Sequence, residues 1–228
     1  MGQAARAHLE SLLRTRKLDV TLTSSVAWAP AVDAAPTGIP AIDDALGGGL
    51  RRGHLSEIVG ARSSGRTSVL CRAMAEATGR GEAVALVDTC DRFDPHSAAA
   101  TGVDLSRLLW VRPSMSSTAA GRPDDANRAL KAMNLILQAG NFGLVAFDLA
   151  DIPSPGIRQF PNTTWMRMSR VIEGTQTVAL IIGAERIARS PGGVTVALDA
   201  PHAKWTGKGA RARLFRGVEL RPRVVGAR

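Results

Sequence analysis

The chain has 228 residues, 45% of them hydrophobic, and a formal net charge of +9. A chain of this length and composition can bury a core of ordinary domain size, which excludes a protein that is disordered throughout. It contains no apolar run near the ~18 residues that a membrane span needs, and the N-terminal segment MGQAARAHLESLLRTRK lacks the apolar stretch of a signal peptide. We therefore expect a cytoplasmic protein without membrane contact.

Segments of strand character alternate along the chain with segments of helical spacing. The predicted strands are His54–Val59, Ala83–Asp88, Leu108–Val111, Phe142–Asp148, Thr177–Ile182 and Val194–Leu198, and the predicted helices are Thr67–Thr78, Asp125–Ala139 and Asn162–Glu173, the last capped by Asn162. Apolar strands in β-α-β order predict an α/β fold, in which helices cover both faces of a mostly parallel sheet. Residues 1–35 are expected to form an N-terminal helix or arm, 36–200 the core, and 201–228 a basic C-terminal β-hairpin or tail.

The stretch Gly60–Thr67, GARSSGRT, matches the phosphate-binding pattern G-x-x-x-x-G-K-[ST] at every fixed position except the lysine, which is Arg66. In this pattern, glycines let backbone N–H groups point at phosphate oxygens ahead of a helix N-terminus. A predicted strand before the loop and a predicted helix after it supply the required context. The residues expected to bind a nucleotide phosphate are Gly60, Ser63, Ser64, Gly65, Arg66 and Thr67. The alternative is a Ser/Gly turn that only caps a helix.

Asp148 ends a predicted strand whose preceding residues are mostly apolar. Open α/β sheets bind ligands at the carboxyl ends of their strands, and a carboxylate there can hold the water shell of Mg²⁺ opposite a phosphate loop. We include Asp148 in the candidate nucleotide site. A strand-end aspartate that caps the next turn is the competing interpretation.

Cysteine and histidine usage predicts no metal centre built by the protein itself. Cys71 and Cys90 and the four histidines lack the spacing of metal ligands. A lone cysteine pair in a cytosolic chain is usually reduced, so we expect free thiols.

The C-terminal segment 201–228 holds eight basic residues against one acidic residue. This density indicates a polyanion or an acidic protein surface as partner, and the alternative is a solvated strand edge that its charges protect from aggregation. Trp205 and Phe215 lie among the basic residues and are suited either to stacking on bases or to packing within a hairpin. The candidate contacts in this segment are Lys204, Lys208, Arg211, Arg213 and Arg216.

The segment Thr37–Leu50, TGIPAIDDALGGGL, followed by a strand and the glycine loop, resembles the opening of the core of RecA-like recombinases. The similarity continues at Phe93-Asp94-Pro95, at Gly102-Val103-Asp104 and at the strand that ends in Asp148. It implies a RecA-like core and ATP or ADP with Mg²⁺ as ligands. Within this superfamily, the segment Arg14–Ser24 and the basic C-terminus look most similar to ImuA-type proteins, accessory factors in bacterial damage-induced mutagenesis.

Three positions depart from the superfamily pattern. Arg66 replaces the loop lysine, Cys90 replaces the glutamate that activates the attacking water, and Gly183-Ala184 replaces a polar Asn-Gln pair that senses the γ-phosphate. A thiol is a poor general base unless it is ionised, and Asp91 beside it would face away along an extended segment. The resemblance therefore implies a RecA-like fold that has lost, or nearly lost, ATP turnover.

The resemblance also implies two DNA-facing loops, near residues 152–164 and 186–193. Arg158 lies in the first, and Arg186 and Arg189 lie in the second, which is enough charge for phosphate contact but not for reading sequence. An N-terminal helix with leucines on one side would mediate self-association, as the equivalent arm does in RecA.

The main hypothesis is a non-catalytic accessory factor in the bacterial DNA damage (SOS) response and translesion synthesis. Such a protein would be nucleoid-associated and would dock on RecA, on subunits of an error-prone polymerase or on single-stranded DNA. The first alternative is an active DNA-stimulated ATPase of the recombinase type, with Asp91 or a water chain in place of the missing base. The second is an inhibitor of cell division similar to SulA, which the comparatively complete glycine loop disfavours.

Overall fold

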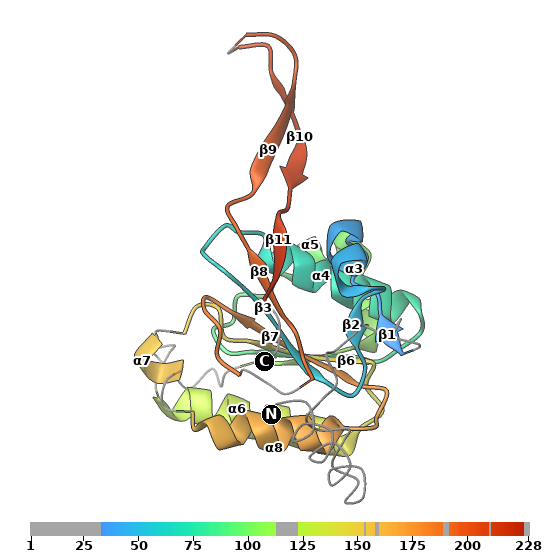
Figure 1. Cartoon of the computed structure of the whole chain (residues 1–228), viewed down its shortest axis with the longest axis vertical. Coiled ribbons are helices and arrows are strands. Elements are labelled where there is room, and N and C mark those ends of the chain that lie inside the picture. The colour runs from blue at the N-terminus through green and yellow to red at the C-terminus, as the bar shows by residue number, and fades with distance from the viewer. Residues whose placement is uncertain are drawn as a thin grey trace, which may run out of the picture. The chain divides into compact units, whose positions relative to one another are not determined.

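In the computed structural model, a seven-stranded sheet in the order β11-β8-β3-β7-β6-β4-β5 forms the centre of the fold (Figure 1). All its neighbouring strands run parallel except β11, which pairs antiparallel with β8. The strands are β1 (Ala34–Ala35), β2 (Leu50–Arg51), β3 (Leu55–Gly60), β4 (Val84–Asp88), β5 (Leu108–Val111), β6 (Leu144–Asp148), β7 (Val178–Gly183), β8 (Thr195–Leu198), β9 (His202–Thr206), β10 (Leu214–Glu219) and β11 (Pro222–Val225). Strands β1 and β2 form a small antiparallel pair, and β9 and β10 form a hairpin.

The structure describes residues 33–112, 123–152, 154–157, 160–188, 192–209 and 211–225, which all belong to one compact unit, Val32–Arg228. The helices are α3 (Pro40–Leu46), α4 (Arg66–Gly79), α5 (Pro95–Thr101), the 3₁₀ turn η1 (Leu105–Arg107), α6 (Pro123–Ala139), α7 (Ser154–Ile157) and α8 (Asn162–Ile172). None of these described helices has the length and apolar character to cross a membrane. The predicted N-terminal arm lies almost wholly outside the described residues.

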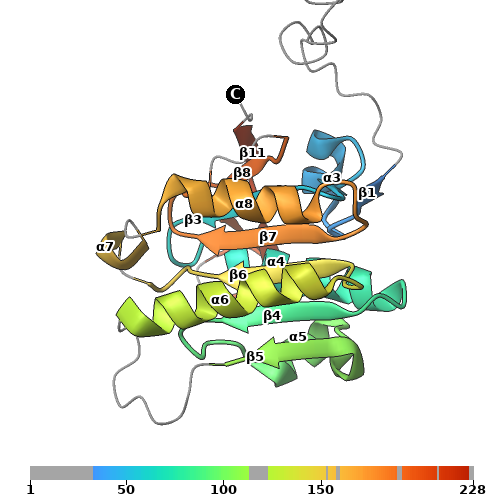
Figure 2. The ribbon, with the colours of Figure 1, turned by 90° about the horizontal axis from the view of Figure 1, so that it is seen from below.

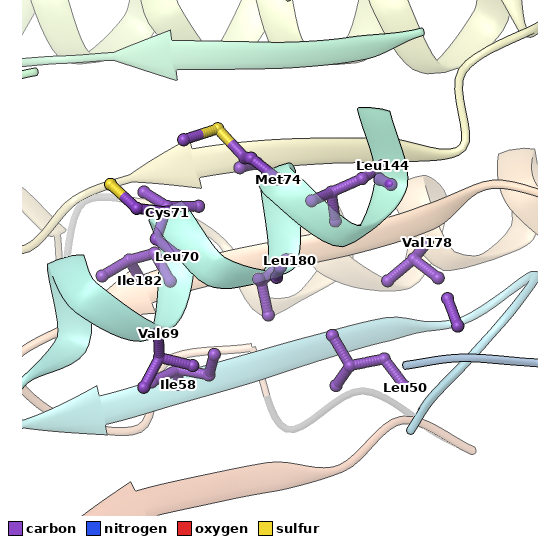
Figure 3. Close-up of a cluster of buried hydrophobic side chains, with 14 of the residues drawn as sticks. Leu50, Ile58, Val69, Leu70, Cys71, Met74, Leu144, Val178, Leu180 and Ile182 are labelled. Carbon is purple, nitrogen blue, oxygen red and sulfur yellow. The ribbon is translucent and has the colours of Figure 1, made fainter. Parts of the chain in front are cut away.

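Helices cover both faces of the sheet, as the sequence predicts. Figure 2 shows α6 and α8 on one face and α4 and α5 on the other. On the α4 face, Leu70 and Met74 pack against Leu180 and Ile182 of β7 and their neighbours (Figure 3). The strands between these layers are buried on both sides, which explains why they appear in the sequence as uninterrupted apolar runs. The predicted α/β fold is confirmed.

Helix α8 shows how spacing in the sequence sets the packing. Trp165, Met168 and Ile172 fall on one side and are buried, whereas Arg167 and Arg170 face solvent. The prediction that Asn162 caps this helix is wrong. Pro161, in an extended conformation, takes the cap position without a side-chain hydrogen bond, and Asn162 is already the first helical residue.

The sheet register places the candidate nucleotide residues at one edge. Asp88 at the end of β4 pairs with Asp148 at the end of β6, and both strands run parallel to β3, which leads into the glycine loop. The carboxyl ends of these strands therefore meet where an open α/β sheet binds its ligands.

Replacing Trp165 by alanine tests the packing under α8. The indole is 1% exposed and contacts the rings of Phe147 and Phe160, with centroids 6.5 and 5.8 Å away. We expect Trp165→Ala to lower the free energy of unfolding by about 3–5 kcal/mol in urea titrations, because the cavity cannot close fully. Met166→Ala, at a neighbouring position that is 47% exposed, should change it by less than about 1 kcal/mol. Equal losses in both variants would contradict this packing.

Candidate functional site

The glycine loop joins the end of β3 to the start of α4 in the strand–loop–helix order that the motif requires. Gly60 permits the tight packing of the loop, because a Cβ atom there would lie 2.5 Å from Ser64 Oγ and 2.8 Å from the Leu198 carbonyl oxygen. Ser63 and Gly65 both have positive φ angles, 62° and 94°. These left-handed residues turn the chain sharply into the first turn of α4.

Two features of the loop fit an anion. Gly65 is the N-cap of the 14-residue helix α4 and offers no side chain to its first N–H groups, so the positive end of the helix has no side-chain cap. Ser64 is 2% exposed, and its Oγ has no hydrogen-bond partner among the described residues. A buried hydroxyl without a partner is costly and is expected where a ligand supplies the missing bond. The side chain of Thr67, which carries a hydroxyl group, is exposed in the first turn of α4.

Arg66 does not extend into solvent from this loop. It is 7% exposed, and its Nη1 donates a 2.8 Å hydrogen bond to the carbonyl oxygen of Gly183, at the end of β7. Two of the departures from the superfamily pattern are therefore in direct contact. The guanidinium binds the backbone of the residue that stands in place of the polar sensor.

Leu220, which lies between β10 and β11, contacts the glycine loop at Gly65. A Cβ atom at Gly65 would come within 2.6 Å of Leu220 Cδ2, so this methyl group covers the N-cap of α4. Leu220 also packs against the apolar cluster under α4. The glycine loop thus contacts the C-terminal segment, a contact that sequence spacing alone does not indicate.

The two strand-end carboxylates differ in their surroundings. Asp88 accepts hydrogen bonds from the backbone N–H groups of Cys90, Arg92 and Phe93 and from Trp110 Nε1, so it is used to hold the turn after β4. Asp148 accepts from the Ala150 N–H, at 2.9 Å. The pKa of Asp148 is raised to about 6, mainly because burial removes water from its carboxyl group; Asp88 acts in the same direction, and the Ala150 N–H and Arg66 oppose the rise. Asp148 is therefore the strand-end carboxylate with capacity for a cation.

Neither residue at the position of the catalytic base is suited to activate water. Burial raises the pKa of the Cys90 thiol, which keeps it protonated near neutral pH. Asp91 has a left-handed backbone (φ 54°) and forms a two-pronged ion pair with Arg112, at 2.8 and 2.9 Å. The hydrogen bond from Arg112 lowers the pKa of Asp91, so this carboxylate is a weak base. The expectation of an extended segment here is wrong, because the chain bends at residues 89–91 and Asp91 has a left-handed backbone.

The cysteines are both free, Cys71 buried and Cys90 partly buried. Across the described residues, no group of three or more His, Cys, Asp or Glu side chains is arranged to hold a metal ion by itself. A magnesium ion that arrives with a nucleotide takes part of its ligands from the phosphates and water. From the sequence, Asp148 is predicted to belong to that set, with Thr67 in the phosphate loop, and the structure places them at the end of β6 and in the first turn of α4.

The two segments implied to face DNA meet around one cavity of about 410 Å³. Its walls include Ile157, Phe160 and Asn162 from the first segment, Arg186 and Ile187 from the second, and the adjacent Glu185. Arg158 and Arg189 lie outside the described residues.

A buried glutamate that the sequence analysis missed holds the second segment in place. Glu57 in β3 is 2% exposed and accepts hydrogen bonds from the N–H groups of Ile187 and Ala188, at 2.8 and 2.7 Å. Arg186 Nε lies 3.9 Å from its other oxygen. The only signal in the sequence is one acid inside the apolar run HLSEIV.

The other candidate contacts lie on the β9–β10 hairpin, which stands away from the sheet (Figure 1). Lys204, Lys208, Arg211, Arg213 and Arg216 are all exposed. Strand β11 returns from this hairpin to the edge of the main sheet beside β8. The hairpin is therefore anchored in the core at both of its ends.

Comparison with known proteins agrees with this geometry. The family model of the RecA N-terminal domain matches residues 20–155. The chain belongs to the RecA family. Protein RecA of Acholeplasma laidlawii is 31% identical over 170 residues, which cover 68% of this chain and 48% of that protein. Protein RecA of Arthrobacter sp. (strain FB24) is 36% identical over 118 residues, 51% of this chain and 31% of that protein.

This RecA family member spans about a third to a half of the length of these relatives. The crystal structure of the RadB recombinase has a similar fold, with a TM-score of 0.50 at 18% identity over 72% of this chain and 83% of the RadB chain. The family and the RecA-like fold are thus shown.

The raised pKa of Asp148 predicts a dependence of stability on pH. With a pKa of about 6 in the folded state against an ordinary 3.8, the folded state binds more protons between these values, so stability falls as pH rises through this window. Asp148→Asn removes the buried charge and should be more stable than the wild type by about 1–3 kcal/mol above pH 6, with the difference shrinking toward pH 4.5. Urea titrations across pH 4.5–8 measure this. Asp151→Asn, at an exposed site in the same loop, is the control, and an Asp148→Asn variant less stable at pH 8 would contradict the prediction.

The contact of Leu220 with Gly65 predicts an effect on nucleotide affinity. Because a phosphate on the N-terminus of α4 must displace this side chain, we expect Leu220→Ala to bind ADP about fivefold more tightly, equivalent to about 1 kcal/mol of apolar contact. Isothermal titration calorimetry compares it with Leu214→Ala, which shortens an exposed leucine on the hairpin. Unchanged or weaker binding in Leu220→Ala would show that the leucine does not cover the phosphate position.

Proposed function

We propose that this RecA family member is a non-catalytic accessory factor in the DNA damage response. In this role it serves damage-induced mutagenesis beside RecA, an error-prone polymerase and single-stranded DNA, as ImuA-type proteins do. The protein uses the RecA-like fold as a docking surface and does not turn over ATP. Self-association through residues 1–35 belongs to the same proposal.

The observation that carries the proposal concerns Cys90 and Asp91, the residues at the position of the catalytic base. Water activation needs a group that accepts a proton near neutral pH. Burial keeps the Cys90 thiol protonated, and both carboxylate oxygens of Asp91 form hydrogen bonds with Arg112. Arg66, bound to the Gly183 carbonyl, adds a second obstacle, because its charge is directed at the sheet and away from the outer phosphates.

Nucleotide binding without turnover is compatible with this role. The loop amides, the Ser64 hydroxyl and Thr67 would hold the phosphates, and Asp148 would hold the water shell of Mg²⁺. Bound Mg²⁺ neutralises phosphate charge. An ATP or ADP molecule held there acts as a structural ligand that orders the loop.

An active DNA-stimulated ATPase is the second candidate. The retained loop geometry and the acceptor capacity of Asp148 favour it. It requires another group to take the role of the missing base. Among the described residues near Cys90, Asp148 has a raised pKa, but in this proposal it holds the water shell of Mg²⁺.

A genetic test separates these two functions. Deleting the gene from its own bacterium should reduce the frequency of mutations induced by ultraviolet light, and the wild-type gene should restore it. A Thr67→Ala gene should restore it equally, because a docking protein does not need the hydroxyl that positions Mg²⁺ for turnover. An unchanged mutation frequency after deletion would remove the proposed role, and failure of Thr67→Ala alone would favour the ATPase.

A further inference from the structure

The β9–β10 hairpin has two chemically different faces. Its register pairs Trp205 with Phe215 and Ala203 with Val218, so these four side chains share one face, in agreement with side-chain alternation along β9. A bulge at Arg216 keeps Phe215 and Val218 on the same side despite their odd spacing. His202, Lys204, Thr206 and Glu219 form the opposite face.

The apolar face is open to solvent over its whole length. Trp205 is 52% exposed, Phe215 50% and Val218 50%. The two rings meet edge to face with their centroids 5.3 Å apart, so they form one rigid aromatic surface. In a hairpin that served only to join β8 to β11, such residues would gain nothing from exposure.

Several cations of this hairpin have no carboxylate partner. Arg213 lies over the Trp205 ring at 5.8 Å, whereas Arg216 donates to Thr206 Oγ1 on the opposite face. Within the described part of the chain, neither these two arginines nor Lys208 and Arg211 at the tip form an ion pair with a carboxylate. By contrast, Lys204 on the opposite face pairs with Glu219 at 3.4 Å, and Arg112 and Arg223, which lie outside the hairpin, also pair with carboxylates. Uncompensated positive charge thus lies beside the aromatic pair at Arg213 and at the adjoining tip of the hairpin.

We propose that the β9–β10 hairpin is a binding surface for single-stranded DNA. Trp205 and Phe215 stack on unpaired bases, and Lys208, Arg211 and Arg213 contact the phosphates. The choice of DNA as the polyanion rests on the function proposed above.

The charge and shape of the hairpin favour single-stranded nucleic acid over an acidic protein. Aromatic rings interleaved with arginines bind a strand that alternates flat bases with charged phosphates, and this needs no particular base sequence. Duplex DNA hides its bases within the stack and offers nothing to the rings. A protein partner would need an acidic and apolar patch of matching shape, and binding to such a patch is an outcome that the experiment can reveal.

Fluorescence anisotropy with a labelled oligothymidylate and the full chain tests the aromatic surface. We expect the Trp205→Ala/Phe215→Ala double variant to bind at least about tenfold more weakly, because it removes stacking on two bases. Leu214→Ala is the matched control, because this leucine is 56% exposed on the same hairpin but pairs with Thr206, away from the aromatic face. It should bind as the wild type does.

Two further variants distinguish stacking from indirect damage to the fold. Trp205→Phe keeps a ring and should retain most of the affinity while removing the quenching of tryptophan fluorescence that the oligonucleotide causes. Lys208→Ala/Arg211→Ala should reduce the slope of log affinity against log salt by about 0.7 for each phosphate that is no longer neutralised. Arg128→Ala and Lys131→Ala, exposed cations on α6, should leave the slope unchanged.

Wild-type oligonucleotide affinity in the double aromatic variant would overturn the inference. Equal loss in Leu214→Ala would also overturn it, by showing that any hairpin change acts through folding. If the aromatic variants bind DNA normally but no longer bind an acidic protein partner, the hairpin is a protein-docking surface and the inference fails. None of these outcomes depends on ATP turnover or on mutation frequency, so failure here is distinct from failure of the proposed function.

Discussion

The hydrogen bond from Arg66 to the Gly183 carbonyl ties the glycine loop to the end of β7, and the candidate site depends on it. A lysine at this position is a flexible point charge, whereas the planar guanidinium has several donors and can stay bound to a backbone oxygen. The bond keeps the positive charge of Arg66 near Asp148, which lowers the free-energy cost of burying the ionised carboxylate. It also places the loop next to the segment that Glu57 anchors, so the nucleotide site and the second loop segment share one support.

This arrangement combines features suited to phosphate with altered groups at the position of the catalytic base. The uncapped start of α4 and the unpartnered Ser64 hydroxyl remain suited to an anion. At the base position, by contrast, the thiol is protonated and the neighbouring carboxylate is held by Arg112. Leu220 further links the loop to the hairpin segment, so changes at the hairpin and at the nucleotide loop can affect each other through one leucine. A RecA-like fold that serves as a docking surface accounts for both sets of features.

Much of the fold could be predicted because its signals are local. Buried parallel strands such as β4 and β7 appear as apolar runs, α8 has an unambiguous helical stripe, and the loop motif gives the position of the site. The short helices α3 and α5 were missed, although each begins with a proline and ends at a left-handed glycine, because seven residues carry too little periodicity. The contacts of Arg66, Glu57 and Leu220 could not be predicted, since each joins segments more than a hundred residues apart whose meeting depends on strand order.

Turnover of ATP by the purified chain, with and without single-stranded DNA, is the measurement that tests the central claim most directly. The account predicts a rate equal to that of Thr67→Ala under both conditions, whether or not calorimetry shows that ATP binds. Turnover that single-stranded DNA stimulates and that Arg66→Ala abolishes would contradict it. The chain would then be a working ATPase with an unrecognised base.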